Sequence, residues 1–338
     1  MNRRVHPLVC SGLAIVLVTA GSTALGQNAD EAAVNRRIEP SMRALHTSAH
    51  ALTLALLTPL LAVAQTQPIA PQPLTIEGAT THVYKTIGGN DLRLHVFSST
   101  PSAGAARRPA IVFFFGGGWT QGTVTQFVPQ AQHFAKRGMV AIVADYRVRL
   151  RHGTTALEAM ADARSAIRWV RSQAATLGID ADRIVAAGGS SGGHIALSAA
   201  VFDTFDEPGE DKKISAKPNA LVLFNPAVDT SRAPAPSERF GTRGRDASPA
   251  QHVAAGLPPI LIVHGKADAT VPYADVERFC TEAAARGNRC QLVGYEGAAH
   301  GFFNAAVAEG KWYRETLLEA DRFLTTLGYL PGTAQRKP

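Results

Sequence analysis

The chain has 338 residues, of which 46% are hydrophobic and 18% charged, and its formal net charge is +7. This composition is that of a globular protein long enough to bury a sizeable core, and it excludes a largely disordered chain. The densest basic stretch, residues 147–152, is short and lacks a nucleic-acid-binding motif. We therefore interpret it as a solvated loop or strand edge and expect no nucleic-acid partner.

Two apolar runs near the start, at 8–26 and 51–65, each follow basic residues, as in signal peptides. The second run contains an Ala-Val-Ala cleavage site at 62–64. Because each run is short for a membrane span, we interpret residues 1–64 as a tandem export segment, with Met42 as a candidate true start. The alternative is a membrane anchor followed by a second apolar helix. Both interpretations predict an exported protein, periplasmic or extracellular, and the first leaves no membrane span after processing.

A proline-containing linker is expected at 65–74, then one domain over 75–332 and a tail at 333–338. Within the domain, a hairpin signal is followed by apolar strand patterns that alternate with amphipathic helix patterns. This order predicts an α/β protein with a doubly wound, mostly parallel sheet and an antiparallel N-terminal hairpin. The predicted strands are 82–87, 92–97, 110–115, 139–146, 183–189, 220–225, 258–265 and 290–295, and the predicted helices are 126–138, 157–178, 194–201, 274–286 and 313–328.

Two polar excursions, at 202–218 and 226–251, interrupt this alternation near the carboxyl ends of predicted elements. Folds of this class build their substrate sites at that edge of the sheet. We expect the two excursions to form a small cap.

Two cysteines, Cys280 late in a predicted helix and Cys290 at the start of the next strand, are close enough in the chain to bridge. An oxidising compartment favours a disulfide between them. The alternative is a pair of buried thiols.

The stretch 188–193, Gly-Gly-Ser-Ser-Gly-Gly, fits the nucleophile-elbow pattern Gly-X-Ser-X-Gly in two registers, around Ser190 and around Ser191. A predicted strand precedes it and a predicted helix follows, which is the context that this tight turn needs. A serine hydroxyl becomes a nucleophile only when a base takes its proton, so a histidine and an orienting carboxylate are also required. The alternative is a plain glycine-rich turn.

The candidates for base and carboxylate are His300 and Asp268. Asp268 follows a predicted strand and His300 lies in the loop after the last strand, and the order Ser, Asp, His is that of the α/β-hydrolase triad. Rival carboxylates are Asp229, Asp275 and Glu296. Asp268 is favoured because it lies directly beyond a strand end and before a helix.

Three glycines, 116–118, follow the buried strand 110–115 and precede Trp119. The oxyanion of a tetrahedral intermediate needs backbone N–H donors, and glycines let the main chain approach a substrate carbonyl. We expect Gly117 and Gly118 to donate, together with the residue that follows the nucleophile. The alternative is a flexible loop. This chemistry requires no metal ion and no cofactor, and none is expected.

The segments GGGW, ADYR, GGSSGGHIA, HGKADATVP and YEGAAHGFF resemble the α/β-hydrolase esterases related to hormone-sensitive lipase, most closely a bacterial acetyl-xylan-esterase-like branch of carbohydrate esterases. The resemblance runs from about 109 to 328 and implies the α/β-hydrolase fold. The family pattern, Gly-X-Ser-X-Gly-Gly with one polar and two apolar residues after it, fits only Ser190 as the nucleophile. Ser191 then becomes an oxyanion donor through its N–H. By the same resemblance, Asp268 and His300 complete the triad.

The chain departs from the family at Phe115, where the family usually has a histidine before the three glycines. The resemblance implies that this histidine braces the oxyanion loop and does not transfer protons. The departure therefore concerns the geometry of the loop and not the triad. Aromatic packing of Phe115 is the substitute that the sequence offers.

These features predict a secreted serine carboxylic ester hydrolase that acts through an acyl-enzyme on small-molecule or carbohydrate esters. Trp119, Phe302 and Phe303 lie next to the predicted chemistry, and bulky rings there would leave room only for acetyl to butyryl groups. One alternative is a serine peptidase or amidase of the prolyl-oligopeptidase type, whose usual propeller domain finds no room in 338 residues. Another is a catalytically inactive hydrolase fold used as a binding module. The sequence carries no sign of an oligomeric state.

Overall fold

The computed structural model describes residues 69–98, 106–233 and 237–332. By its internal contacts the chain divides into two units, Met1–Thr66 and Gln67–Pro338, and the second holds all described residues. The predicted export segment and the predicted tail lie outside the described residues. Within the described ranges, none of the helices combines the length and apolar character that crossing a bilayer requires.

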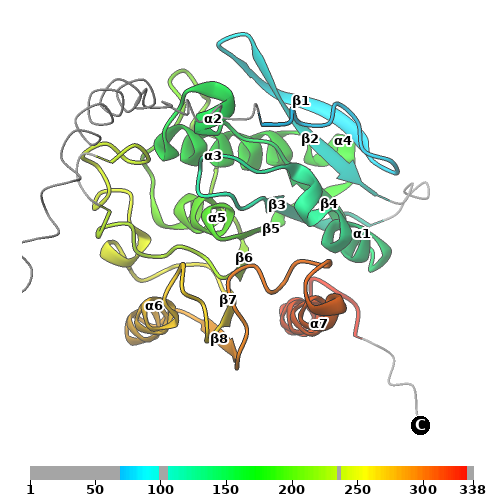
Figure 1. The fold of residues 1–338 in the computed structure, drawn as a ribbon. Helices are drawn as coiled ribbons and strands as arrows, with labels where there is room; N and C mark the ends of the chain where they lie inside the picture. Colours follow the sequence, from blue (N-terminus) through cyan, green and yellow to red (C-terminus); the bar gives the residue numbers. More distant parts are fainter. Residues whose placement is uncertain (1–68, 99–105, 234–236, 333–338) are drawn as a thin grey trace, which may run out of the picture. The chain divides into compact units, whose positions relative to one another are not determined.

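An eight-stranded mixed sheet runs through the described unit in the spatial order β1-β2-β4-β3-β5-β6-β7-β8 (Figure 1). Strand β2 pairs antiparallel with β1 and with β4, and the remaining pairs are parallel. The predicted mostly parallel sheet with an antiparallel hairpin is therefore confirmed. The strands are β1 (Thr80–Ile87), β2 (Asn90–Phe97), β3 (Arg108–Phe114), β4 (Val140–Ala144), β5 (Ile179–Gly189), β6 (Ala220–Phe224), β7 (Ile260–Gly265) and β8 (Cys290–Tyr295).

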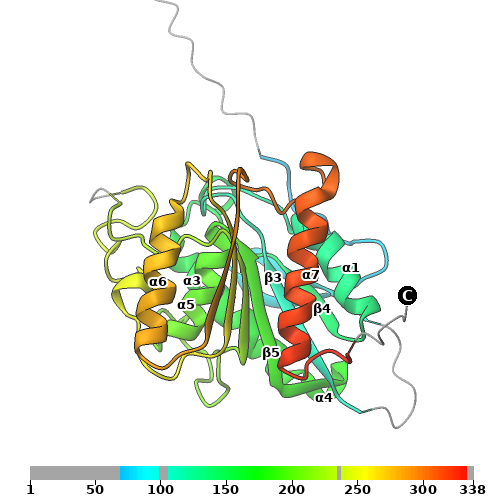
Figure 2. The same cartoon turned by 90° about the horizontal axis from the view of Figure 1, so that it is seen from below.

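Helices cover both faces of the sheet, with α1 and α7 on one face and α3, α5 and α6 on the other (Figure 2). Strands β4, β6 and β7 are buried along their whole length, because each is covered from both sides. The helices are η2 (Val124–Phe127), α1 (Val128–Lys136), α2 (Arg149–His152), α3 (Ala156–Ser172), α4 (Ala174–Leu177), α5 (Ser191–Val201), η3 (Pro249–Gln251), α6 (Tyr273–Ala285), η4 (Ala308–Gly310) and α7 (Lys311–Thr326).

Local sequence explains where several elements begin and end. Gly88 and Gly89 both have positive φ angles, 57° and 75°, which is the backbone of the two-residue turn that joins β1 to β2. Thr155 and Glu158 form a capping box at the start of α3. The predicted helix 157–178 is divided, because Gln173 leaves the helical conformation (φ −92°, ψ 10°) between α3 and α4.

The two excursions expected to form a cap differ in what they contact. The first, 202–218, packs against α3, where Arg164 and Arg168 of the helix both pair with Asp206. Of the two, only the second excursion contributes described residues to the cavity that contains Ser190 and His300. The expected cap is therefore limited to 226–251. The first excursion does not line the cavity, because its ion pairs hold it against α3.

Cys280 near the end of α6 and Cys290 at the start of β8 form a disulfide, with their Cα atoms 5.4 Å apart. The sequence-based expectation of a bridge is thus confirmed. The bridge ties α6 to the amino end of β8.

Replacing both cysteines by alanine should lower the free energy of unfolding by about 2–3 kcal/mol, because the open chain regains the entropy of a loop of ten residues. Denaturant unfolding of the wild type and the double variant measures this difference. Adding a reductant should lower the midpoint of the wild type and leave that of the double variant unchanged. Equal midpoints for the oxidised wild type and the double variant would contradict the prediction.

Candidate active site

The carboxyl ends of the parallel strands β3 to β8 meet at one edge of the sheet, and a cavity of about 540 Å³ opens there. Its size lies within the range of small-molecule sites. Loops that leave five of these strands line the cavity. They contribute, among others, Gly116, Gly117 and Gly118 after β3, Ser190 after β5, Asn225 after β6, Thr270 after β7 and His300 after β8.

Ser190 sits on a tight turn between β5 and α5 and has a positive φ angle (φ 53°, ψ −118°), which is rare for a residue with a side chain. Its N–H donates to the carbonyl of Phe224 over 2.9 Å. A Cβ on Gly188 would lie 2.6 Å from the backbone of Gly192, and a Cβ on Gly192 would lie 2.1 Å from the Phe114 carbonyl oxygen. The turn therefore leaves no room for a Cβ at 188 or 192, and the positive φ angle places Ser190 at its centre.

Ser190, His300 and Asp268 form a chain of hydrogen bonds. The Oγ of Ser190 lies 3.0 Å from Nε2 of His300, and Nδ1 of His300 lies 2.7 Å from Oδ2 of Asp268. The other carboxylate oxygen of Asp268 accepts from the N–H groups of Thr270 and Val271. Burial would raise the pKa of Asp268, but these hydrogen bonds outweigh it and hold the pKa below its ordinary value. An ionised carboxylate thus orients an imidazole that can take the serine proton.

The rival carboxylates are engaged elsewhere. Asp229 accepts from two serine hydroxyls and pairs with Arg278, and Asp275 pairs with the same arginine. Glu296 pairs with a surface lysine. Ser191, the rival nucleophile, is buried at the first position of α5. Ser190 and Asp268 are thus the serine and the carboxylate that lie beside the imidazole.

The glycines after β3 form the second half of the site. Gly117 (φ 138°) and Gly118 (φ 64°) have positive φ angles, and a Cβ on Gly117 would lie 2.0 Å from a backbone oxygen. Gln126 fixes the loop, because it accepts from the Gly116 N–H and donates to Asn304 in the loop that carries the imidazole. Among the described residues, the N–H groups of Gly117, Gly118 and Ser191 donate to no other protein atom. They are available to an anionic oxygen.

Phe115 stacks on Tyr146, with ring centroids 4.1 Å apart and planes 18° from parallel. The hydroxyl of Tyr146 donates to the Phe115 carbonyl over 2.7 Å. The ring of Phe115 also lies against Gly122, where a Cβ would come within 2.5 Å of it. Aromatic packing therefore supports the glycine loop at the position where the resembling family has a histidine.

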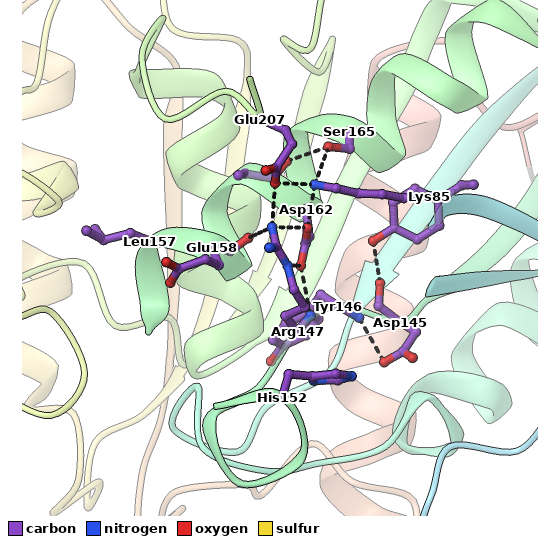
Figure 3. A network of polar contacts seen from close by, with 12 residues as sticks. Lys85, Asp145, Tyr146, Arg147, His152, Leu157, Glu158, Asp162, Ser165 and Glu207 are labelled. Carbon is purple, nitrogen blue, oxygen red and sulfur yellow. Dashed lines mark hydrogen bonds and ion pairs between the residues drawn. The ribbon is translucent and has the colours of Figure 1, made fainter. Parts of the chain in front are cut away.

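Buried ion pairs lie next to Tyr146, around Arg147 and Asp162 (Figure 3). Nε and Nη2 of Arg147 each donate to the carboxylate of Asp162 over 2.8 Å, and Lys85 donates to the same group over 2.7 Å. Glu207 pairs with both cations. Buried charges are tolerated when they are paired. Asp162 also accepts from the N–H of Arg147 over 2.9 Å, which holds the backbone next to Tyr146.

This network corrects the prediction of a solvated stretch at 147–152. Arg147 is only 7% exposed, because Asp162 and Glu207 neutralise it inside the protein. Residues 149–152 form the short helix α2 instead of a strand edge.

Of the three aromatic residues predicted to line the pocket, Trp119 and Phe303 do so. Phe302 does not. It is buried between Tyr295 and Trp312, with ring centroids 5.2 and 6.3 Å away, so it belongs to the core and the prediction for it is wrong.

Phe240, from the second excursion, takes the place in the pocket wall that was expected for Phe302. Its ring packs edge-on against Trp119, with centroids 4.9 Å apart. Nε1 of Trp119 donates to Nδ1 of His194, and the other ring nitrogen of His194 contacts the Ala247 carbonyl. Burial lowers the pKa of His194 to about 4. The imidazole is therefore neutral, with its proton on Nε2, and holds Trp119 in place.

Sequence reasoning missed Asn225. It directly follows β6, is fully buried and has a positive φ angle of 35°. Its Nδ2 lies 3.2 and 3.4 Å from the two ring nitrogens of His300. The signal that could have found it is its position beyond the strand between those that lead to Ser190 and Asp268. Among the described residues, no three His, Cys, Asp or Glu side chains converge as metal ligands would.

Asp145, directly after β4, is buried. Its Oδ1 accepts from the N–H of Tyr146 over 2.8 Å and from the side chain of Gln72 over 2.9 Å. Gln72 lies in the segment that the sequence analysis assigned to a linker. Burial raises the pKa of Asp145 to about 7, although Arg151 opposes this shift. The folded protein therefore holds a proton here near neutral pH.

Asp145→Asn should change how the stability of the protein depends on pH. The unfolded chain releases the Asp145 proton near the ordinary pKa of 3.8, but the folded protein keeps it to about 7, so the wild type loses stability as the pH rises between these values. The variant cannot lose this contribution, and its stability relative to the wild type should rise by at most about 4 kcal/mol from pH 4 to 8. Urea unfolding measures the difference, with exposed Asp203→Asn as the control for net charge. If the variant and the wild type differ in free energy of unfolding by the same amount at every pH, the prediction is contradicted.

Comparisons with known proteins agree with this geometry. A family model described as BD-FAE matches residues 98–235, and the prolyl oligopeptidase family model matches residues 227–321. Esterase LipC of Mycobacterium tuberculosis (strain ATCC 25618 / H37Rv) is 31% identical over 222 residues, which cover 57% of this chain and 53% of the relative. Isoprenylcysteine alpha-carbonyl methylesterase ICME of Arabidopsis thaliana is 26% identical over 223 residues, covering 59% and 52%. The chain spans about half the length of these curated relatives.

Solved structures are similar over nearly their whole length. Thermogutta terrifontis esterase 2 phosphorylated by paraoxon is 47% identical with a TM-score of 0.73, and the match covers 76% of this chain and 97% of that one. The butyrate-bound form of Est2 from the same species is 45% identical with a TM-score of 0.72, covering 77% and 97%. Identity at this level over an almost complete neighbour, on the same sheet, shows that the chain belongs to the α/β-hydrolase family of serine esterases.

Proposed function

We propose that this protein is a secreted serine carboxylic ester hydrolase that cleaves short-chain acyl esters, with acetylated carbohydrates as one class of natural substrate. The observation that carries the proposal is the hydrogen-bonded chain from Asp268 through His300 to Ser190, which faces the same cavity as the free N–H groups of Gly117 and Gly118. Nucleophile, base and oxyanion donors are the parts that acyl transfer needs. The signal-like N-terminal sequence supports export.

In the acylation step, Ser190 Oγ attacks the ester carbonyl carbon while Nε2 of His300 takes its proton. The carbonyl π electrons move to oxygen, and this oxyanion accepts hydrogen bonds from the N–H groups of Gly117, Gly118 and Ser191. The intermediate collapses, the bond to the alcohol oxygen breaks, and His300 returns the proton to the leaving alcohol. Asp268 holds the imidazole in the required tautomer and stabilises the imidazolium.

Deacylation repeats these steps with water as the nucleophile. His300 takes a proton from water, the resulting hydroxide attacks the acyl carbon, and the bond to Ser190 Oγ breaks. The proton passes to the serine, and the short carboxylic acid leaves. Loss of a single oxyanion donor in such a site typically costs about 100- to 1,000-fold in rate.

The pocket wall supports a short acyl group. Rings of Trp119, Phe240 and Phe303 border the cavity of about 540 Å³ that contains Ser190 and His300. Solved structures of Thermogutta terrifontis Est2 hold propionate and butyrate, acids of this length.

A serine peptidase is the second candidate, because the prolyl oligopeptidase family model matches residues 227–321. The test is hydrolysis of p-nitrophenyl acetate, acetylated xylan and a peptide p-nitroanilide by the purified protein. Fast ester and negligible anilide hydrolysis supports the proposal. Anilide hydrolysis at a comparable kcat/KM would favour the peptidase.

Ser190→Ala should lower kcat by several orders of magnitude while the protein stays folded, because the nucleophile is lost. Ser191→Ala should keep most of the activity, because it retains the N–H that faces the oxyanion. Steady-state kinetics with p-nitrophenyl acetate, alongside circular dichroism, compares the two. An active Ser190→Ala with an inactive Ser191→Ala would show that the turn works in the other register.

The acyl-length profile should peak between acetyl and butyryl and fall steeply by octanoyl. Each methylene that finds apolar space adds about 0.8 kcal/mol of binding, so an open pocket would instead favour longer chains steadily. Values of kcat/KM for p-nitrophenyl esters from acetyl to decanoyl measure the profile. A maximum at octanoyl or beyond would contradict the short-chain part of the proposal.

A further inference from the structure

Arg239 is held at the tip of a tight hairpin in the second excursion. Ser237 and Gly241 exchange two backbone hydrogen bonds, of 2.9 and 2.8 Å, across the turn. The Arg239 carbonyl accepts from the N–H of Ala156 at the start of α3 over 2.7 Å, and the next residue, Phe240, is buried. The hairpin bonds, the bond to α3 and the buried Phe240 together fix the backbone that carries Arg239.

The side chain of Arg239 lies beside the oxyanion loop. It lines the same cavity as Ser190, and its Cζ lies 5.9 Å from the centre of the Trp119 ring. Its Nη2 is 3.8 Å from the point that a Cβ on Gly118 would occupy. The guanidinium therefore faces the space where a bound ester must sit.

In the part of the chain that the structure describes, this cation has no carboxylate partner. Two carboxylates, Asp229 and Asp275, also line it, but both are paired with Arg278 and Arg232. Among the described lining residues, Arg239 is the one arginine or lysine, and within the described chain no carboxylate lies within ion-pair distance of it. A cation at the cavity wall with no described carboxylate beside it suits an anionic group on the ligand.

We propose that Arg239 binds a carboxylate on the substrate, so that the preferred substrates are esters carrying a carboxylate on the acyl or the alcohol part. This inference rests on the proposed esterase function. A guanidinium presents a planar fork of N–H donors that matches a carboxylate with two parallel hydrogen bonds. The charge also attracts anionic esters to the cavity before they bind.

Two pairs of esters test this, each comparing a carboxylate with its neutral amide. Ethyl hydrogen succinate and ethyl succinamate place the group on the acyl part, and 3-acetoxybenzoate and 3-acetoxybenzamide place it on the alcohol part. The measured quantity is the ratio of kcat/KM for acid over amide, followed by pH-stat at neutral pH. In at least one pair this ratio should fall about tenfold in Arg239→Gln. In Arg239→Glu it should drop below one, so that the amide becomes the better substrate.

The matched control is Arg243→Gln, which removes the same charge from the same excursion at an exposed side chain that lies over Phe205, outside the cavity. Its ratio should equal that of the wild type. Raising the salt concentration should lower the ratio of the wild type but not that of Arg239→Gln. Unchanged ratios in both pairs for Arg239→Gln would overturn the inference. A wild type that hydrolyses neither these esters nor p-nitrophenyl acetate would instead overturn the proposed function.

Discussion

Ser190 adopts a positive-φ backbone conformation that costs about 1–3 kcal/mol for a residue with a side chain, and its neighbours hold it there. Its N–H donates to the carbonyl of Phe224 at the end of β6, and glycines at 188 and 192 let the turn lie against the end of β3. This turn lifts the hydroxyl out of the sheet to within 3.0 Å of His300. A Cβ at either glycine would force the turn away from β3, and the hydroxyl would leave the base and the oxyanion donors together.

The supports of the oxyanion loop come from three separate directions. Phe115 and Tyr146 stack beneath it, and the ion pairs around Asp162 fix the strand end that carries Tyr146. Gln126 ties the first glycine to the loop of the catalytic base. On the pocket side, neutral His194 holds Trp119. The donors are thus oriented before any substrate arrives, which is how such groups lower a barrier without reorganising.

The sheet and the positions of Ser190 and Asp268 could be predicted because buried strands have continuous apolar runs, and both residues follow such a run. His300 lies in the loop after the half-buried strand β8 and could be found by its place in the order Ser, Asp, His. Side chains in loops could not be placed in this way. Phe302 and Phe303 are adjacent and chemically alike, and only the packing of Phe302 between two other aromatic residues separates core from pocket. The pocket-facing arginine depends on a hairpin that is held by the Ala156 N–H at the start of α3, a contact that no local pattern in the sequence reveals.

The central claim is that Ser190 carries the acyl group. Trapping with paraoxon, followed by peptide mass spectrometry, tests it most directly, because the solved structure of a similar esterase is one phosphorylated by this compound. We predict one diethylphosphoryl group per chain, on Ser190, formed in step with the loss of esterase activity. Loss of activity with the label on Ser191, or with neither serine labelled, would contradict the account.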